Sequence, residues 1–385
     1  MTKKIAILYP LFLGGGAELV TLWMIQALKD QYDVSLVTFS EENFKTWDRQ
    51  FGTNLERAQI TIRSPYASSP LFRNARKYSL FTIRQHLLAS YYRKIEPEFD
   101  LGIAAFNEMD LGRAGIQYIH SPLFGHGNEA ARRVFGYPAS VSRVIYQRLC
   151  EWITGYSDAR MKRNLTLTNS KWTADLIKAT YGIESQVLYP PVILNPPDTP
   201  WVERENGFIC SGRISPDKNL ETVIEIIHQV RERGHNVHLH ILGGNADPGY
   251  EIKIRKLCNQ YPSWLSMEEV ASRSELALIL AKHRYGIHGR ATETFGISVA
   301  EMACAGCIPF VPSGGGPAEI VEQDKRLVYR DMAEAIEKIV EILSHNQSAS
   351  SISSSLRSKS AQYSLNRFNE ELLKTVRKMI LAHKD

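Results

Sequence analysis

Short apolar segments alternate with helical patterns in two successive series, and this repetition restricts the chain to a parallel α/β fold. The first series predicts strands at 5–9, 34–38, 101–105, 115–119 and 165–168. The second series predicts strands at 207–212, 237–242, 285–288 and 308–311, with helices at 220–233 and 332–343. Five prolines between Pro190 and Pro200 separate the two series and form a stiff connector.

The 385 residues exceed what a single hydrophobic core usually serves, so the two series predict two Rossmann-like, doubly wound domains. We place an N-terminal domain over 1–195, a C-terminal domain over 196–364 and an amphipathic closing helix within 365–385. The serine-rich segment 345–358 predicts a loose loop or a frayed helix start. Open α/β domains bind ligands at the carboxyl ends of their strands, so a cleft between the domains is the expected site.

Composition narrows the class of protein further. A net charge of +5 suits contact with phosphate, and without a nucleic-acid-binding motif it predicts no nucleic-acid partner. Five cysteines, an odd number, favour a reducing, cytoplasmic compartment, and the pair Cys304 and Cys307 is predicted to be two reduced thiols. Residues 3–13 resemble a short signal peptide, but Pro10 and the glycines after it favour a first strand entering a glycine loop.

Two glutamates flank the start of a predicted helix in the segment 288–301. Glu293 precedes that start, and Glu301 lies about two turns further on. Thr292 and Thr294 are predicted N-caps, and Gly296 allows a ligand to approach the backbone. Free N–H groups at a helix start bind anions, whereas carboxylates accept hydrogen bonds from hydroxyls. The segment therefore suits a ligand with both groups, such as a nucleotide-sugar.

Two cations follow the first strand of the second series. Arg213 and Lys218 lie between that strand and the helix predicted from 220, which is where a diphosphate site is built. A hydrolase that uses Glu293 and Glu301 is the rival interpretation, and it requires carboxyl groups about 5–10 Å apart across one bond. The cations favour sugar transfer, and because no carboxylate pair has metal-site spacing, we predict neither a metal nor any other cofactor.

Taken together, these residues resemble the retaining GT-B glycosyltransferases of family 4, and in particular their dolichol-linked mannosyltransferase branch. The motifs that carry the resemblance are Gly212-Arg213, Lys218-Asn219, Glu293 to Glu301 with Phe295-Gly296, Gly314 to Glu319, Asn169-Ser170 and Tyr189 to Val192. The N-terminal half matches more loosely, mainly through Gly14 to Glu18 and through His120 to Pro122.

The resemblance implies a role for each matching residue. Binding of the donor diphosphate is implied for Arg213, Lys218, Phe295, Gly296, Ile297 and Ser298. Glu293 would contact donor-sugar hydroxyls at the reacting carbon, His120 would lie near the sugar, and Glu301 would accept the ribose hydroxyls. Gly15 and Gly16 would let the first domain's loop approach donor or acceptor.

The resemblance also implies a GT-B fold, in which two domains face each other across a cleft and a C-terminal helix crosses back to the first. The implied reaction moves a sugar from a nucleotide-diphosphate-sugar, GDP-mannose or a UDP-sugar, to a hydroxyl of a glycan or lipid-linked glycan, with retention. Such a reaction belongs to cell-surface polysaccharide or glycolipid assembly. A sugar-nucleotide epimerase of the same fold and a non-catalytic nucleotide-sugar-binding protein are the alternatives.

Two basic segments that also carry aromatic residues, 72–95 and 131–163, allow two interpretations. One is a solvated helix face. The other is binding to the inner face of an anionic membrane, which would suit a lipid-linked acceptor.

The histidines give weaker signals. His228, His235, His238 and His240 lack ligand spacing with carboxylates, so they are predicted to be sheet or surface residues. His288 and Arg290 adjoin the glutamate motif, and for His288 a structural role and a donor contact are equally favoured.

Overall fold

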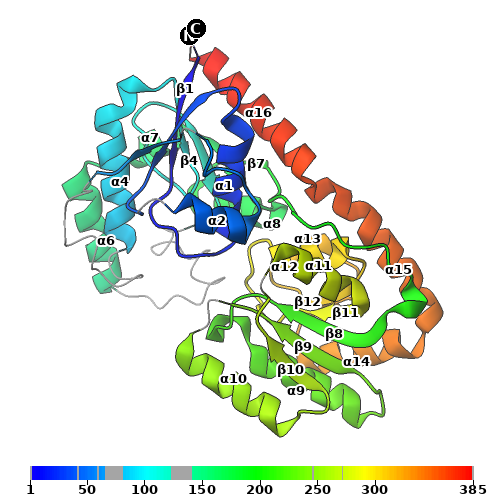
Figure 1. Cartoon of the computed structure of the whole chain (residues 1–385). Helices are drawn as coiled ribbons and strands as arrows, with labels where there is room; N and C mark the ends of the chain where they lie inside the picture. The colour runs from blue at the N-terminus through cyan, green and yellow to red at the C-terminus, as the bar shows by residue number, and fades with distance from the viewer. Residues whose placement is uncertain are drawn as a thin grey trace. The chain divides into compact units, whose positions relative to one another are not determined.

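The computed structural model describes residues 2–40, 43–58, 60–65, 81–122, 141–244, 247–270 and 272–383. The chain divides into two compact units (Figure 1). Unit 1 comprises Met1–Pro191 together with Asn366–Asp385, and unit 2 comprises Val192–Leu365. The division falls within the proline-rich connector, four residues before the boundary placed after residue 195.

Unit 1 contains a seven-stranded parallel sheet in the order β3-β2-β1-β4-β5-β6-β7. Its strands are β1 Lys4–Leu8, β2 Asp33–Val37, β3 Thr61–Arg63, β4 Leu101–Ala104, β5 Ile116–Ile119, β6 Leu165–Thr168 and β7 Gln186–Val187. The five predicted strands are confirmed to within a residue at each end. The prediction missed β3 and β7, which are short, partly exposed edge strands without an apolar run.

The helices described in unit 1 flank this sheet. They are α1 Gly16–Leu28, α2 Phe44–Phe51, α4 Phe81–Ile95, α6 Val141–Thr154, α7 Asp158–Met161, α8 Lys171–Tyr181 and α16 Leu365–Ala382. Ser170 caps α8, because its side chain accepts a hydrogen bond from the backbone N–H of Thr173.

Helix α16 belongs to unit 1 except for its first residue, although residues 192–364 of unit 2 precede it in the sequence. An apolar side chain is buried every four residues along it, from Phe368 to Ile380. Both ends of the chain meet at Asp100 (Figure 1): the Lys3 ammonium lies 2.5 Å from its carboxylate, and His383 Nδ1 lies 3.3 Å from its carbonyl oxygen.

Unit 2 contains a six-stranded parallel sheet in the order β10-β9-β8-β11-β12-β13. Its strands are β8 Glu205–Ser211, β9 His238–Leu242, β10 Leu265–Glu268, β11 His283–Ile287, β12 Ile308–Pro312 and β13 Val328–Tyr329. Its helices are α9 Leu220–Glu232, α10 Pro248–Gln260, α11 Arg273–Lys282, α12 Ile297–Cys304, α13 Pro317–Ile320, α14 Met332–Ser344 and α15 Asn346–Lys359.

The prediction of a loop or frayed start over 345–358 is wrong, because this segment forms helix α15. Ala349, Ile352 and Leu356 recur at helical spacing and are buried, so they anchor the helix despite its serines. The Ser353 hydroxyl also donates a 2.6 Å hydrogen bond to the Gly306 carbonyl. Burial of three apolar side chains outweighs the weak helix propensity of the surrounding serines.

In each sheet, successive strands are added on one side of the first strand and then on its other side. In unit 2 the chain builds outward from β8 through β9 to β10 and then returns to place β11 on the other side of β8. The carboxyl ends of β8 and β11 therefore flank a topological switch point, where loops diverge and leave room for a ligand. In unit 1 the same relation holds between β1 and β4.

Candidate functional site

The loops that follow β8 and β11 meet at the switch point of unit 2. Together they line a pocket whose walls include Gly212, Arg213, Lys218 and His288. A Cβ atom on Gly289 would lie 2.6 Å from the Lys218 carbonyl oxygen, so only glycine permits this approach of the two loops. These loops hold the two predicted cations and the first predicted glutamate, and the structure brings them together.

Lys218, which lines this pocket, forms an ion pair with Glu293. Lys218 Nζ lies 2.6 Å from Glu293 Oε2, with the two side chains 14% and 16% exposed. Burial opposes ionisation of the carboxyl group, but the charges of Lys218 and Arg290 outweigh burial and hold the pKa of Glu293 well below its usual range. Glu293 is therefore a carboxylate throughout the physiological pH range.

The pair belongs to a larger network of alternating charges. Arg290 Nη1 lies 3.8 Å from Glu293 Oε2 and 2.8 Å from Asp217 Oδ2, and Arg213 Nη2 lies 3.8 Å from the same Asp217 oxygen. Three cations thus share two carboxylates, leaving one positive charge in excess. Arg213 is 42% exposed at the outer end of the network, where an incoming anion can reach it. Asp217 and Arg290 were absent from the predicted set, because their partners become apparent only once the loops are placed side by side.

His288 lies against this network, at the end of β11. Its side chain is 2% exposed, and its Nε2 atom lies 3.7 Å from Glu293 Oε2. Burial, reinforced by the charge of Lys218, lowers the pKa of His288 to about 3, so the imidazole is neutral at pH 7. The structure thus makes this histidine a buried wall of the pocket that adds no positive charge.

Helix α12 begins at Ile297, and its cap differs from the prediction. Gly296, at φ 90°, is the N-cap residue and no side chain caps the helix, so the assignment of Thr292 and Thr294 as N-caps is wrong. The left-handed conformation favours glycine, which explains why a glycine precedes the helix. The backbone N–H groups of Ile297 and Ser298 lie in the first turn, where they have no acceptor within the helix.

The glycine run 314–316 packs against the segment that carries Glu293. A Cβ atom on Gly315 would lie 2.4 Å from the Glu293 carbonyl oxygen, and one on Gly316 would lie 2.2 Å from that of Thr294. The Gly316 N–H also donates a 2.9 Å hydrogen bond to the Glu293 carbonyl. Phe295 is buried, with its ring packed edge-on against Tyr363. This packing holds the Glu293 backbone in place. It explains why the glycine run occurs in the same chain as the glutamate motif.

Glu301 is buried in α12 and has a partner that the sequence did not reveal. Its Oε1 atom lies 2.6 Å from Arg273 Nη2, and the same guanidinium donates a 2.9 Å hydrogen bond to the Ile193 carbonyl. Arg273 begins α11, 28 residues earlier in the chain. The role of Glu301 toward ribose stays a prediction. Arg273 is the residue that holds the Glu301 carboxylate.

The residues predicted in unit 1 also lie at carboxyl ends of strands. His120 follows β5, where its backbone N–H donates to the Asn107 side chain and its Nε2 lies 3.3 Å from the Ala105 carbonyl oxygen. Burial lowers the pKa of His120 to about 4, so it is neutral at pH 7. Gly15 caps α1 and Gly16 begins it, after the turn that follows β1. Their roles toward a sugar stay predictions.

Comparison with known proteins agrees with this architecture. The crystal structure of HepE from Anabaena in complex with UDP and glucose aligns with a TM-score of 0.66 and 17% identity over 98% of this chain and 100% of that one. WaaG, a glycosyltransferase involved in lipopolysaccharide biosynthesis, aligns with a TM-score of 0.68 and 16% identity over 97% and 99%. The predicted GT-B fold class, two Rossmann-like parallel α/β domains, is confirmed.

Sequence comparison gives a further match. Residues 194–363, in the second unit, match the family model of glycosyl transferases group 1. A GDP-Man:Man(3)GlcNAc(2)-PP-Dol alpha-1,2-mannosyltransferase from Dictyostelium discoideum is 25% identical over 63% of this chain. The protein of the same name from Caenorhabditis elegans is 23% identical over 88% of this chain and 84% of its own length. The match to the Dictyostelium protein spans about half of that protein, 52%.

Replacing Lys218 with methionine should raise the pKa of His288, because it removes the cation that opposes protonation of this imidazole. NMR titration of the imidazole signals should show that His288 begins to protonate at a higher pH in the variant than in the wild type. Lys253→Met, which removes an exposed lysine on α10, serves as the matched control. Identical titration of His288 in all three proteins would contradict the described network.

Proposed function

We propose that this chain is a glycosyltransferase that moves a mannosyl residue from GDP-mannose to a hydroxyl of a lipid-linked glycan, with retention of anomeric configuration. The observation that carries the proposal is the network of three cations and two carboxylates at the switch point of unit 2. A site with one excess positive charge, beside the first turn of a helix, suits a diphosphate.

The donor would be bound when its diphosphate takes the place of Glu293 as the partner of Lys218. A diphosphate that enters beside Arg213 competes with Glu293 for the Lys218 ammonium, and the N–H groups of Ile297 and Ser298 can then donate hydrogen bonds to the phosphate oxygens. The displaced Glu293 carboxylate, still ionised, becomes available to a sugar hydroxyl. Glu301, oriented by Arg273, would accept hydrogen bonds from the ribose hydroxyls.

The same cations would assist the chemical step. As the bond between the sugar carbon and the diphosphate oxygen breaks, negative charge grows on the phosphate that leaves. Arg213 and Lys218 stabilise that charge, and the acceptor oxygen forms the new bond to the sugar carbon while its proton leaves with the nucleoside diphosphate. Because the cations supply this stabilisation, we propose a reaction that requires neither a metal nor another cofactor.

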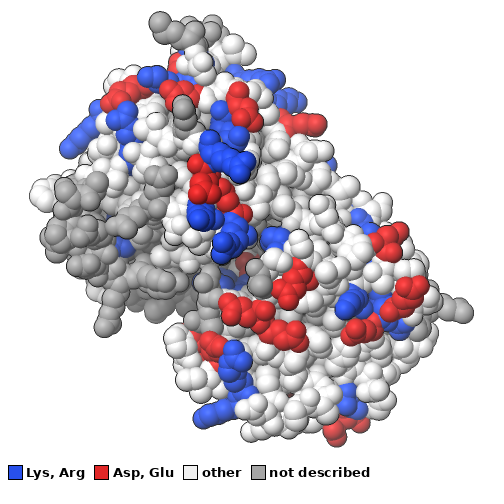
Figure 2. Space-filling model, in the orientation of Figure 1, with Lys and Arg blue, Asp and Glu red and all other residues white. Residues whose placement is uncertain are grey.

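The choice of donor and acceptor rests on the relatives. Proteins named as GDP-mannose-dependent transferases acting on a dolichol-linked glycan match this chain in Dictyostelium, Caenorhabditis and human. HepE carries UDP and glucose on the same fold at lower identity, so a UDP-sugar is the donor to compare with GDP-mannose. Acidic and basic residues are interspersed over the visible face of the described residues (Figure 2), which does not favour nucleic acid as a partner.

The two basic segments, 72–95 and 131–163, differ in how far their described side chains are exposed. In the first, Arg84 and Tyr92 are buried in α4 and Arg93 is paired with Asp110, so these side chains do not form a membrane-facing surface. Arg73, Arg76, Lys77, Arg132, Arg133, Phe135 and Tyr137 lie outside the described residues. Among the described residues, no helix is both long and apolar enough to span a membrane.

Helix α6, in the second segment, supports a peripheral membrane contact. Apolar side chains at helical spacing lie open to solvent along it, and they are Val141, Val144, Ile145, Leu149, Trp152 and Ile153. Trp152 is 80% exposed and Arg148 lies within the same stripe with its side chain 74% exposed. An apolar stripe that carries a tryptophan and an arginine suits the interface of an anionic bilayer, where a lipid-linked acceptor would be found.

The proposed reaction is tested by incubating the purified protein with GDP-mannose and a synthetic polyprenyl-diphosphate glycan. We expect GDP release and a mannosylated lipid only when both substrates are present, also in the presence of chelator. The variant Glu293→Gln should lose at least about 100-fold in turnover, because it removes a charge at the reacting centre, yet bind GDP no more weakly than the wild type.

Glu337→Gln, which changes an exposed carboxylate on α14, is the control and should keep full turnover. UDP-glucose replaces GDP-mannose in a parallel reaction. Isomerised donor formed without acceptor would indicate an epimerase, and near-normal turnover of the Glu293→Gln variant would contradict the role given to this residue.

The membrane contact of α6 is tested with the triple variant Ile145→Ser, Trp152→Ser and Ile153→Ser. Loss of this apolar surface should weaken binding to phosphatidylserine-containing vesicles by more than about tenfold in a sedimentation assay. Val202→Ser, 80% exposed in unit 2, is the control and should bind as the wild type does. Equal sedimentation of the triple variant and the wild type would refute this contact.

A further inference from the structure

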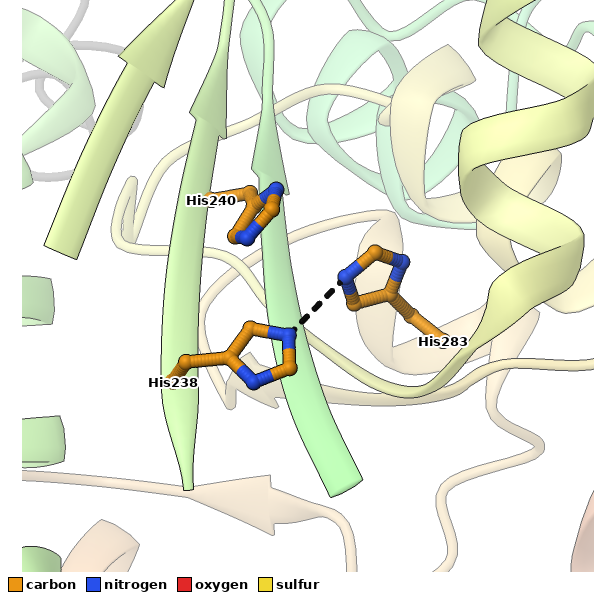
Figure 3. Close-up of side chains that lie close together, drawn as sticks. All are labelled: His238, His240 and His283. Atoms are coloured by element: carbon orange, nitrogen blue, oxygen red, sulfur yellow. Dashed lines mark hydrogen bonds between the residues drawn. The ribbon is translucent and has the colours of Figure 1, made fainter. Parts of the chain in front are cut away.

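Three histidines of unit 2 gather far from the candidate donor site. His238 and His240 alternate along β9 and therefore point to the same face of the sheet, and His283 begins β11. Figure 3 shows the ring of His283 facing the other two rings, and the ligand nitrogens of all three lie within 4.8 Å of one another. The sequence predicted sheet or surface positions for His238 and His240, because they lack ligand spacing with carboxylates. His283 lies 45 residues after His238 and comes close to it only in the folded sheet.

A glycine makes this approach possible. Strand β8 separates β9 from β11, so a side chain from one must cross β8 to reach the other. Gly207 is the residue of β8 in register with His238, and a Cβ atom at this position would lie 2.0 Å from His238 Nε2. The imidazole therefore occupies the space that any other residue at 207 would fill.

The distances fit a metal site. His238 Nε2 lies 3.1 Å from His283 Nε2, and Glu205 Oε2 lies 3.4 Å from the first and 3.6 Å from the second. In a tetrahedral zinc site with bonds of about 2.0–2.1 Å, ligand atoms lie about 3.3–3.4 Å apart. Three ligand atoms from β8, β9 and β11 thus already hold nearly the required separations.

The orientation of the rings is also suited to coordination. His283 Nδ1 lies 2.8 Å from the Ile279 carbonyl oxygen, to which it donates, so the Nε2 atom of the neutral ring carries no proton. The Nε2–H of His238 can then donate to His283, and a change of tautomer in His238 frees both nitrogens for a metal. His240 Nδ1 lies 3.4 Å from a Glu268 carboxylate oxygen, which orients this third ring.

We propose that Glu205, His238, His240 and His283 bind Zn²⁺ or a similar late first-row divalent metal ion. Nitrogen ligands with one carboxylate suit such ions rather than Mg²⁺ or Ca²⁺. The site joins the amino-terminal ends of β8, β9 and β11, whereas the candidate donor site lies at the carboxyl ends of the same sheet. The metal therefore ties three strands together and stabilises unit 2, independently of the proposed transfer reaction.

The test is metal binding by the full-length protein after treatment with chelator. Calorimetric titration with Zn²⁺ should give one site per chain, and Zn²⁺ should raise the melting temperature. Co²⁺ in place of Zn²⁺ should give the intense visible absorption of a four-coordinate site. The double variant His238→Ala/His283→Ala should lose all three signals, whereas His235→Ala, which removes a histidine just before β9, should keep them.

Gly207→Ala provides a second variant that leaves every ligand in place. Its added methyl group displaces the His238 ring, so Zn²⁺ affinity should fall by at least about tenfold, as for other changes around metal ligands. Far-ultraviolet circular dichroism without metal would establish that both variants are folded, and Glu205→Gln replaces the double variant if it is not. Zn²⁺ binding that is equal in the wild type and the folded variants, or absent from the wild type, would overturn the proposal.

Discussion

The ion pair between Lys218 and Glu293 is the interaction on which the site of unit 2 depends. It joins the loop after β8 to the loop after β11 at the switch point of the sheet, and it holds a carboxylate in its charged form despite burial. Removing charges from water is costly unless each has a partner, and here Glu293 and Asp217 lie beside the buried cations Lys218 and Arg290. In the proposed reaction, the donor diphosphate would replace Glu293 as the partner of Lys218, so that donor binding would release the Glu293 carboxylate.

The strand pattern and the motif positions could be predicted because both are local. Buried parallel strands appear as short apolar runs, and the site residues follow directly after such runs, as Arg213 does after β8. The cap of α12 could not be predicted in the same way, since Thr292 and Thr294 have suitable side chains but Gly296 has the backbone conformation that the turn requires. The pairing of Glu301 with Arg273 was missed because it depends on how α11 and α12 pack.

The two ends of the strands in the sheet of unit 2 carry different chemical groups. Loops at the carboxyl ends of its strands carry the alternating charges, whereas three imidazoles gather at the amino ends, beside Gly207. This second grouping depends on the strand order β9-β8-β11, which no spacing along the chain reveals. The sequence therefore predicts residues of the candidate donor site that the structure brings together, whereas the three-dimensional fold is needed to find the histidine site.

Calorimetric titration with GDP tests whether the cations at the switch point bind a nucleoside diphosphate. We expect that GDP binds the wild type and that Lys218→Met weakens this binding by at least about tenfold, because a charged contact to phosphate is lost, whereas Lys253→Met leaves the dissociation constant unchanged. Equal affinity of the wild type and Lys218→Met for GDP would contradict this expectation.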